Sequence, residues 1–355
     1  MKAIIRKILV FVFIGGWTIF RKVLGPGGQG FLKDLLEKIE AQENVFITYH
    51  TRPKKAIQVS TVNDSLKKEK KLAVILQGPI IAENNFTLET LKIYQEHFKG
   101  HLLVLSTWEG EDEAVLVKAE EMGAHCITSK KPDYFGISNI NLQIVSSKAG
   151  VKKASELGAE YIFKTRTDQR MYAPNTSEYL YNIIENFPVT GNYPKQKRRI
   201  IGVSLNTFKY RMYGLSDMAI YGSTEDMLLY WDIDEDTRVI SAQERKDVSN
   251  DVPLVMRLRV SEVYLATEFL RKVDREILWT LEDSWQAFAD NFCIVDKEQL
   301  DLFWFKYNRN EYRWLSYRQV YRAQEMTFRE WFNIYFGIKN KNINKDLVSE
   351  DIYTI

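Results

Sequence analysis

The chain has 355 residues, of which 45% are hydrophobic and 13% aromatic, and its formal net charge is +2. This length allows one large domain with extensions or two smaller ones, and the apolar content argues against disorder over most of the chain. A near-neutral charge gives no reason to expect nucleic-acid binding, which usually needs a basic domain or stripe. The two cysteines, Cys126 and Cys293, lie far apart in the sequence and are expected to be reduced.

The N-terminal segment is basic and apolar. Residues 1–33 carry six basic side chains and no acidic one, and residues 8–20 form an uncharged run between two basic pairs. As a helix this run would be about 20 Å long, which is shorter than the ~30 Å hydrocarbon core of a bilayer. An interfacial helix, a short signal anchor, a buried core helix and a cleaved signal peptide remain alternatives. We expect residues 1–24 to form a membrane-anchor helix.

A linker is expected at residues 25–70. It contains a flexible break, GPGGQG, at 25–30, and then a short amphipathic helix at 31–40. The charged stretch KKEKK at 67–71 is expected to be solvated, so the globular domain should begin at about residue 71.

From residue 72 onward, apolar strands alternate with helices. Strands are expected at 72–76, 102–105, 125–128, 161–164, 200–205, 218–221 and 292–295, and helices at 87–98, 111–122, 144–157, 224–231 and 263–272. This order predicts an α/β fold with a mostly parallel sheet flanked by helices, over residues 71–300. The aromatic and basic residues that follow are expected to form a C-terminal helical extension, residues 301–355.

The polar residues that follow each strand are the candidate site, because ligands of such sheets bind beyond the C-terminal strand ends. The first strand is followed by Gln77, Gly78 and Pro79. Glycine lets a ligand approach the backbone closely and proline fixes the turn, although an ordinary turn is the alternative. Neither a dinucleotide-binding GxGxxG nor a P-loop motif follows.

The second strand is followed by Trp108 and Glu109. A tryptophan here could stack on a base or a sugar while the carboxylate accepts a hydroxyl. A helix start with a locally packed tryptophan is the alternative.

Amide side chains gather after the third strand, at the start of the next helix. They are Asn139, Asn141 and Gln143, and Lys148 follows about two turns into the helix. A helix start favours anions, and the lysine could help to neutralise a diphosphate. An asparagine cap would explain one of these amides, but not the cluster.

The fourth strand is followed by the segment that matters most. It contains Asp168 between Arg166 and Arg170. A carboxylate just past a buried strand can hold a divalent cation against the phosphates of a sugar nucleotide, and the two arginines are candidate phosphate contacts. An exposed ion pair in a turn is the alternative interpretation.

Taken together, these segments resemble the WavE lipopolysaccharide-synthesis family of bacterial proteins. The resemblance implies a GT-A-like, Rossmann-like glycosyltransferase domain that uses a nucleotide-sugar donor and a lipid-linked or lipopolysaccharide acceptor. It also implies a place at the cytoplasmic face of the inner membrane. The matching stretches are ILQGPI (75–80), LSTWEGED (105–112), NINLQIVSSKAG (139–150) and FKTRTDQR (163–170), with a fainter match at 214–226.

The resemblance also implies a metal site. The pattern is similar to that of GT-A enzymes, in which an Asp-x-Asp after the fourth strand holds Mn²⁺ or Mg²⁺. Here position 166 is arginine, so only Asp168 of the pair remains, and all four histidines precede it. The expectation is a metal at Asp168, with arginine-assisted phosphate binding as the alternative.

An inverting transfer needs a carboxylate beside the acceptor hydroxyl. Asp217 is the first choice for this base. The other candidates are Glu225, Asp226, Glu282 and Asp283, and for each of these four a helix-cap or surface role is the alternative.

Other functions remain as alternatives. One is a non-catalytic component of a surface-glycan assembly complex that keeps the fold. A nucleotidyltransferase would need a glycine- and lysine-rich loop after the first strand, and residues 77–82 hold no lysine or arginine. The basic cluster at 195–199 could meet lipid headgroups or an anionic glycolipid, or could be a solvated loop.

Overall fold

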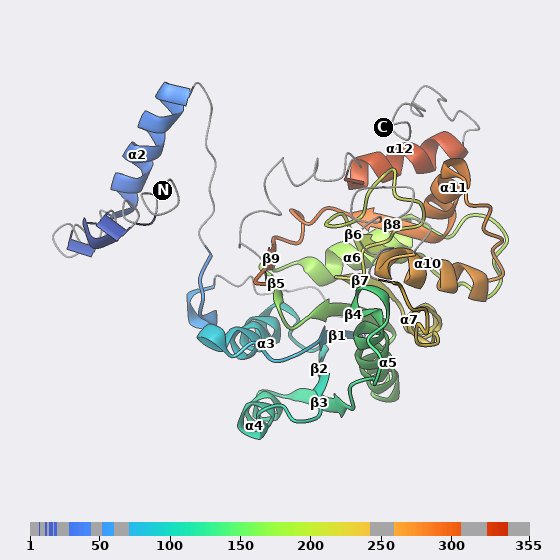
Figure 1. Ribbon diagram of the computed structural model, residues 1–355, viewed down its shortest axis with the longest axis horizontal. Helices are drawn as coiled ribbons and strands as arrows, with labels where there is room; N and C mark the ends of the chain where they lie inside the picture. The colour runs from blue at the N-terminus through green and yellow to red at the C-terminus, as the bar shows by residue number, and fades with distance from the viewer. Residues whose placement is uncertain are drawn as a thin grey trace. The chain divides into compact units, whose positions relative to one another are not determined.

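The computed structural model describes residues 52–59, 71–241, 259–306 and 325–339, helix α2 (Gly28–Glu43), and part of residues 7–19. The chain forms two compact units, Met1–Arg52 and Pro53–Ile355. The second unit contains both β-sheets (Figure 1).

The first unit is helical where it is described. Helix α2 begins at Gly28, so the prediction of a flexible break through residue 30 is wrong. Phe11 and Val12, within the predicted anchor, are helical and exposed, and much of the remaining run lies outside the described residues. Among the described residues, no helix is both long and apolar enough to cross a membrane.

The second unit is built on a seven-stranded mixed sheet with strand order β3-β2-β1-β4-β7-β6-β8. Strands β3, β2, β1 and β4 are parallel, β7 runs antiparallel to both of its neighbours, and β6 and β8 are parallel. This arrangement confirms a mixed, mostly parallel sheet. The strands are β1 (Leu72–Gln77), β2 (Leu102–Trp108), β3 (Ala124–Ser129), β4 (Tyr161–Arg166), β6 (Ile200–Val203), β7 (Ile220–Ser223) and β8 (Phe292–Val295).

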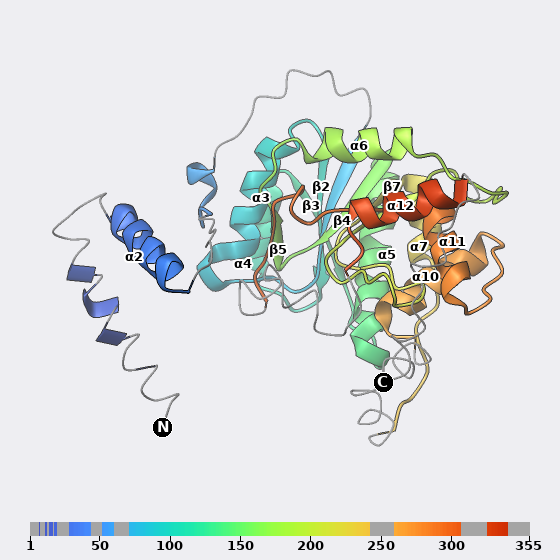
Figure 2. The same ribbon diagram turned by 90° about the horizontal axis from the view of Figure 1, so that it is seen from above.

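Helices cover both faces of this sheet. The connections through α3 and α4 move outward along β1, β2 and β3, whereas α5 returns across the sheet to β4. Right-handed crossovers therefore place α5 on the face opposite α3 and α4, as Figures 1 and 2 show. The helices are α3 (Phe86–His97), α4 (Glu113–Glu121), α5 (Ile140–Glu156), α6 (Thr176–Asn186), α7 (Thr224–Trp231), α10 (Ser261–Lys272), α11 (Leu281–Asn291) and α12 (Phe328–Lys339).

The strand order reverses between β1 and β4, and this switch point sets the position of the site. Every residue of β1 is buried, as expected for a strand covered on both faces. In the parallel register Gln77 pairs with Arg166, so the last residues of the two strands are neighbours. Crevices at such switch points are where open α/β sheets bind ligands.

Where it is described, the chain after Gln299 contains a strand as well as a helix. Strand β9 (Leu302–Trp304) pairs antiparallel with β5 (Gln169–Met171), just after the fourth strand, so a helix there was the wrong expectation. The pairing brings the Trp304 ring beside Asp168, which the sequence pattern did not reveal. Helix α12 does pack on the domain, where Trp331 and Tyr335 contact Phe187. Residues 307–324 and 340–355 of the predicted extension lie outside the described residues.

Candidate functional site

The end of β4 carries a tightly paired arginine and aspartate. Arg166 Nε donates to Asp168 Oδ1 at 2.8 Å, and one terminal nitrogen of its guanidinium donates to Oδ2 at 3.0 Å. Trp304 Nε1 donates to the same Oδ2 at 3.2 Å. The carboxylate is buried, whereas the arginine side chain is 19% exposed. The Arg166 guanidinium is therefore held in one orientation beside the point where the strand order reverses.

The charge state of Asp168 follows from these contacts. Burial alone would raise its pKa, but the hydrogen bonds and charge of Arg166, together with Trp304, hold the pKa below its usual range. Asp168 is therefore a carboxylate at neutral pH, and Arg166 is its counter-ion.

As arranged, these residues do not fit a resident divalent cation. Both oxygens of Asp168 already accept hydrogen bonds from cationic or neutral donors. Within the described ranges, no group of three or more His, Cys, Asp or Glu side chains converges on a common point. A metal at Asp168 would need the Arg166 guanidinium to leave the carboxylate.

A second polar cluster lies next to this pair. Lys164, two residues earlier on β4, is fully buried, and its Nζ donates to Gln143 Oε1 at 2.9 Å and to the main-chain oxygen of Asp217 at 2.6 Å. Gln143 Nε2 in turn donates to the Asp217 carboxylate. The structure thus brings together two predicted residues, one from α5 and one from the connection that precedes β7.

Glu262, at the start of α10, extends this cluster. It accepts a hydrogen bond from Asn206, and its carboxylate lies 3.9 Å from the Arg211 guanidinium. Burial raises the pKa of Glu262, Arg211 opposes this, and the negative charge of Asp217 adds to it. Two carboxylates are therefore close enough to repel each other in a mostly buried site.

The turn after β1 packs closely against the residues that follow β4. Gly78 has a φ of 122°, and an added Cβ would come within 3.0 Å of Thr167 Oγ1. Gln77 Nε2 donates to Ser146 Oγ at 2.8 Å, but its buried Oε1 meets no hydrogen-bond donor among the described residues. A buried acceptor without a partner is uncommon in proteins. Pro79 is exposed beside it.

The tryptophan at the end of β2 does not lie at the protein surface, where a ligand could stack on it. Trp108 is only 3% exposed, so its ring packs inside the protein, whereas Glu109 is exposed. Glu111 instead joins the two turns, because its Oε1 accepts from Ile80 N and from Thr107 Oγ1, each at 3.3 Å.

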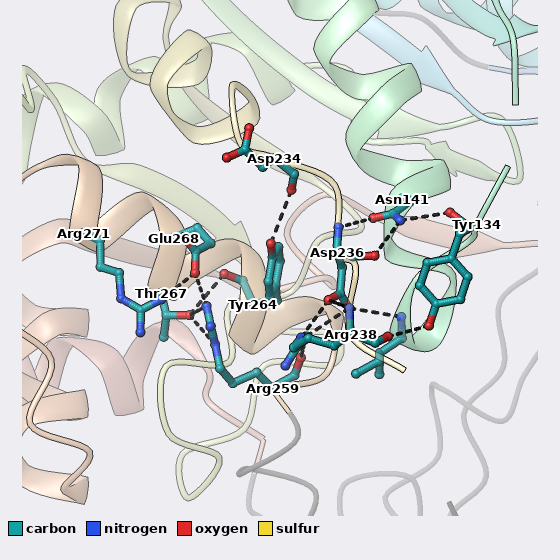
Figure 3. A network of polar contacts seen from close by, with 11 residues as sticks. Tyr134, Asn141, Asp234, Asp236, Arg238, Arg259, Tyr264, Thr267, Glu268 and Arg271 are labelled. Atoms are coloured by element: carbon teal, nitrogen blue, oxygen red, sulfur yellow. Dashed lines mark hydrogen bonds and ion pairs between the residues drawn. The ribbon is translucent and has the colours of Figure 1, made fainter. Parts of the chain in front are cut away.

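Asn141 belongs to a structural network (Figure 3). Its amide donates to the main-chain oxygens of Tyr134 and Asp236, and its oxygen accepts from Asp236 N. Asn139 is exposed and immediately precedes α5 with a left-handed φ of 61°, and its side chain makes no capping hydrogen bond. We therefore leave Asn141 out of the proposed ligand contacts.

The same network fastens the start of α10. Arg238 and Arg259 each lie 4.8 Å from the centre of the Tyr264 ring, and Arg238 forms hydrogen bonds with both oxygens of Asp236 (Figure 3). Gln143 is two residues beyond Asn141 and Glu262 two residues before Tyr264. The network thus fixes the two elements that carry cluster residues.

Two predicted phosphate contacts have protein partners. Lys148 pairs with Asp232 at 2.6 Å. Arg170 is buried, with its guanidinium 4.3 Å from the Phe86 ring centre, and donates to Thr90 Oγ1 and to the main-chain oxygen of Phe86. We assign Arg170 a structural role and leave both residues out of the proposed site.

The other candidate acids also have local roles. Asp283 accepts from Arg275 at 2.9 Å and from Leu278 N at 3.1 Å, near the start of α11. Asp226 is fully buried and accepts from the main-chain nitrogens of residues 197 and 198. The basic cluster is therefore not simply a solvated loop, because Arg199 within it is also buried.

The family of this chain follows from its match to a family model. The model described as WavE lipopolysaccharide synthesis matches residues 72–352. The chain belongs to the WavE family. Membership indicates a role in lipopolysaccharide synthesis. No curated protein matches this WavE chain.

Solved structures with distant similarity to this WavE protein include 4-diphosphocytidyl-2C-methyl-D-erythritol synthase from Anaerococcus prevotii DSM 20548. Its TM-score is 0.34 at 10% identity, and the match covers 76% of this chain and 99% of that chain. A second is CMP:2-keto-3-deoxy-manno-octonic acid synthetase complexed with CTP, with a TM-score of 0.30, 12% identity, and coverage of 53% and 86%. At these TM-scores neither likeness supports an argument about function.

The sequence pattern missed two ionisable residues of the WavE site. Lys164 lies inside an apolar strand rather than after it, and a charged residue in such a strand is the signal that could have found it. Glu262 has no such signal, because an acidic residue in the first turn of a helix is ordinary.

Proposed function

We propose that this WavE protein is a glycosyltransferase that moves a sugar from a nucleotide-sugar donor to a lipopolysaccharide core or a related surface-glycan acceptor. One observation carries the proposal. The turn after β1, with Gly78, and the Arg166–Asp168 pair after β4 meet at the point where the strand order reverses. The second polar cluster, with Asp217, lies next to them.

The donor diphosphate is assigned to the glycine turn and Arg166. Gly78, with its φ of 122°, lets the turn after β1 pack closely against Thr167 beside this pair, and the partly exposed guanidinium of Arg166 supplies positive charge. Asp168 keeps that guanidinium oriented. As the bond between the sugar and the diphosphate breaks, negative charge grows on the leaving phosphate, and a fixed cation stabilises it.

The acceptor hydroxyl is assigned to Asp217. In this mechanism the hydroxyl oxygen attacks the anomeric carbon, the bond to the diphosphate breaks, and the hydroxyl proton passes to the Asp217 carboxylate. The carboxylate is 4% exposed and receives a hydrogen bond from Gln143. These steps describe an inverting transfer.

The need for Mg²⁺ or Mn²⁺ stays a prediction, and no step here passes through a metal. A metal bound at Asp168 would neutralise the diphosphate in the way proposed for Arg166. Sugar transfer that survives incubation with EDTA would remove this expectation.

The first test is donor binding. Thermal shift with UDP, GDP and CMP should identify a stabilising nucleotide, and a screen of its sugar conjugates with product mass measurement should detect transfer. Asp217→Asn should abolish transfer and keep the nucleotide shift, whereas Asp274→Asn, which alters an exposed pair with Lys195, should keep both transfer and the nucleotide shift. A protein that binds nucleotide but transfers no sugar would favour the non-catalytic assembly role.

A further inference from the structure

A lysine in the middle of the main sheet is the buried cation least explained by the fold. Lys164 is 0% exposed, and the Trp231 ring centre lies 5.0 Å from its Nζ. Its two hydrogen-bond acceptors are an amide oxygen and a main-chain oxygen, from Gln143 and Asp217. No ion pair joins Lys164 to a carboxylate among the described residues. Burying a cation in this way costs stability.

The three residues form a closed ring of contacts. Lys164 binds the oxygen of the Gln143 amide, so the amide nitrogen must face the other way, where it donates to the Asp217 carboxylate. The same Nζ also holds the main chain of Asp217. The lysine therefore sets both the position of Asp217 and the direction of the amide that binds it.

Charged and titratable groups surround this ring from every side. Arg166 and Asp168 follow on the same strand, Tyr230 of α7 and Glu262 of α10 lie within electrostatic reach of Asp217, and Arg211 faces Glu262. Burial lowers the pKa of Lys164 to about 7, Arg166 acts in the same direction, and the two aspartates oppose it. An ammonium and a neutral amine both keep at least two N–H groups, so both hydrogen bonds persist through this titration.

A second buried lysine shows what a structural role looks like. Lys297 pairs directly with Glu325 at 2.5 Å, and both side chains are nearly inaccessible. Removing one partner of such a pair leaves a buried charge uncompensated, which destabilises strongly. Lys164 has no such partner among the described residues, so an apolar side chain of similar length would leave two neutral acceptors without a donor but no buried charge uncompensated.

We infer that Lys164 is a positioning residue, which acts through Gln143 and through the Asp217 main chain to hold the Asp217 carboxylate toward the acceptor hydroxyl. The inference rests on the proposed glycosyl transfer. It assigns no contact with substrate to Lys164 itself. A site that keeps a costly buried cation with only neutral acceptors is better explained by function than by stability.

The kinetic test compares Lys164→Met and Gln143→Leu with Lys297→Met and the unchanged protein, using the donor that the screen identifies. Both ring variants should lower kcat by up to about 100-fold, the cost of a misplaced group, with the donor KM little changed. Lys297→Met should leave both kcat and the donor KM close to those of the unchanged protein.

The stability test needs no activity. Lys164→Met should lower the Tm less than Lys297→Met does, because it leaves no buried charge unpaired. A Tm of Lys164→Met as low as that of Lys297→Met, or ring variants with an unchanged kcat, would overturn the inference. An unchanged protein that transfers sugar from no donor contradicts the proposed function instead.

Discussion

Arg166 occupies the position where an Asp-x-Asp would place its first acid, and its pairing with Asp168 gives that substitution a physical meaning. The Asp168 carboxylate is paired here with a guanidinium that already carries positive charge. At the scale of single residues, Asp168 can either orient Arg166 for phosphate binding or bind a metal itself. The hydrogen bonds between Asp168 and Arg166 favour the first of these roles.

Arg166→Met should weaken binding of a nucleoside diphosphate by roughly 10- to 100-fold, the loss expected for a charge-assisted hydrogen bond. Arg166→Lys should recover only part, because an ammonium cannot reproduce the bidentate contact. Isothermal titration with the diphosphate and with the bare nucleoside would measure this. Arg198→Met, at an exposed pair with Glu185, is the control. Equal losses for nucleoside and diphosphate would contradict a phosphate role.

Lys164 should also make the stability of the folded protein depend on pH. Its pKa is about 7 in the folded protein and 10.5 for the free group. Between these values the unfolded chain holds a proton that the folded one has lost, so stability from this group rises with pH. The stability of Lys164→Met relative to the unchanged protein should therefore be higher at pH 7 than at pH 9, as measured by urea unfolding. A difference independent of pH would contradict the lowered pKa.

At the scale of elements, Arg170 joins three parts of the chain. From β5 it reaches Phe86 and Thr90 on α3 and the main-chain oxygens of residues 53 and 54. Arg170→Met should lower the free energy of unfolding by about 3 kcal/mol, since several buried acceptors lose their donor. Urea unfolding would measure this, with Arg271→Met, which alters a partly exposed pair with Glu268, as the control.

The same variant separates the structural role from the predicted phosphate contact. Folded Arg170→Met protein should bind nucleotide as tightly as the unchanged chain, because the guanidinium is enclosed by protein acceptors. Weakened nucleotide binding at unchanged stability would restore the phosphate role.

The elements that the sequence predicted best were those with continuous apolar runs. The strands β1, β2 and β4 were expected within a few residues, because strands buried on both faces leave a nearly uninterrupted apolar pattern. Helices α6 and α11 were not predicted, although both are amphipathic. Strand β5 is only three residues long and polar in sequence, and it is specified by its partner β9 more than 130 positions later.

At the scale of the whole molecule, only part of the candidate site could be predicted from the sequence. The rule that ligands bind beyond strand ends found Gln77 and the Arg166–Asp168 pair, because that rule needs only local patterns. It could not find the contacts of Asp217 with Lys164, since these join segments more than 50 positions apart. It also could not show that Arg170 points into the protein.

The two units of the chain are expected to have separate roles, membrane binding for the first and nucleotide binding for the second. The unit that begins at Pro53 contains every residue of the proposed site, whereas the uncharged, apolar run at residues 8–20 and the two basic pairs that flank it belong to the other unit. A chain that starts at residue 53 should bind nucleotide like the full chain but lose association with vesicles that contain phosphatidylglycerol. The basic residues near that run should each contribute about 1 kcal/mol on an anionic surface, so binding of the full chain should weaken with salt. Vesicle sedimentation of both chains, with phosphatidylcholine vesicles as the control, would measure this, and equal sedimentation of the two chains would exclude a membrane role for the N-terminal segment.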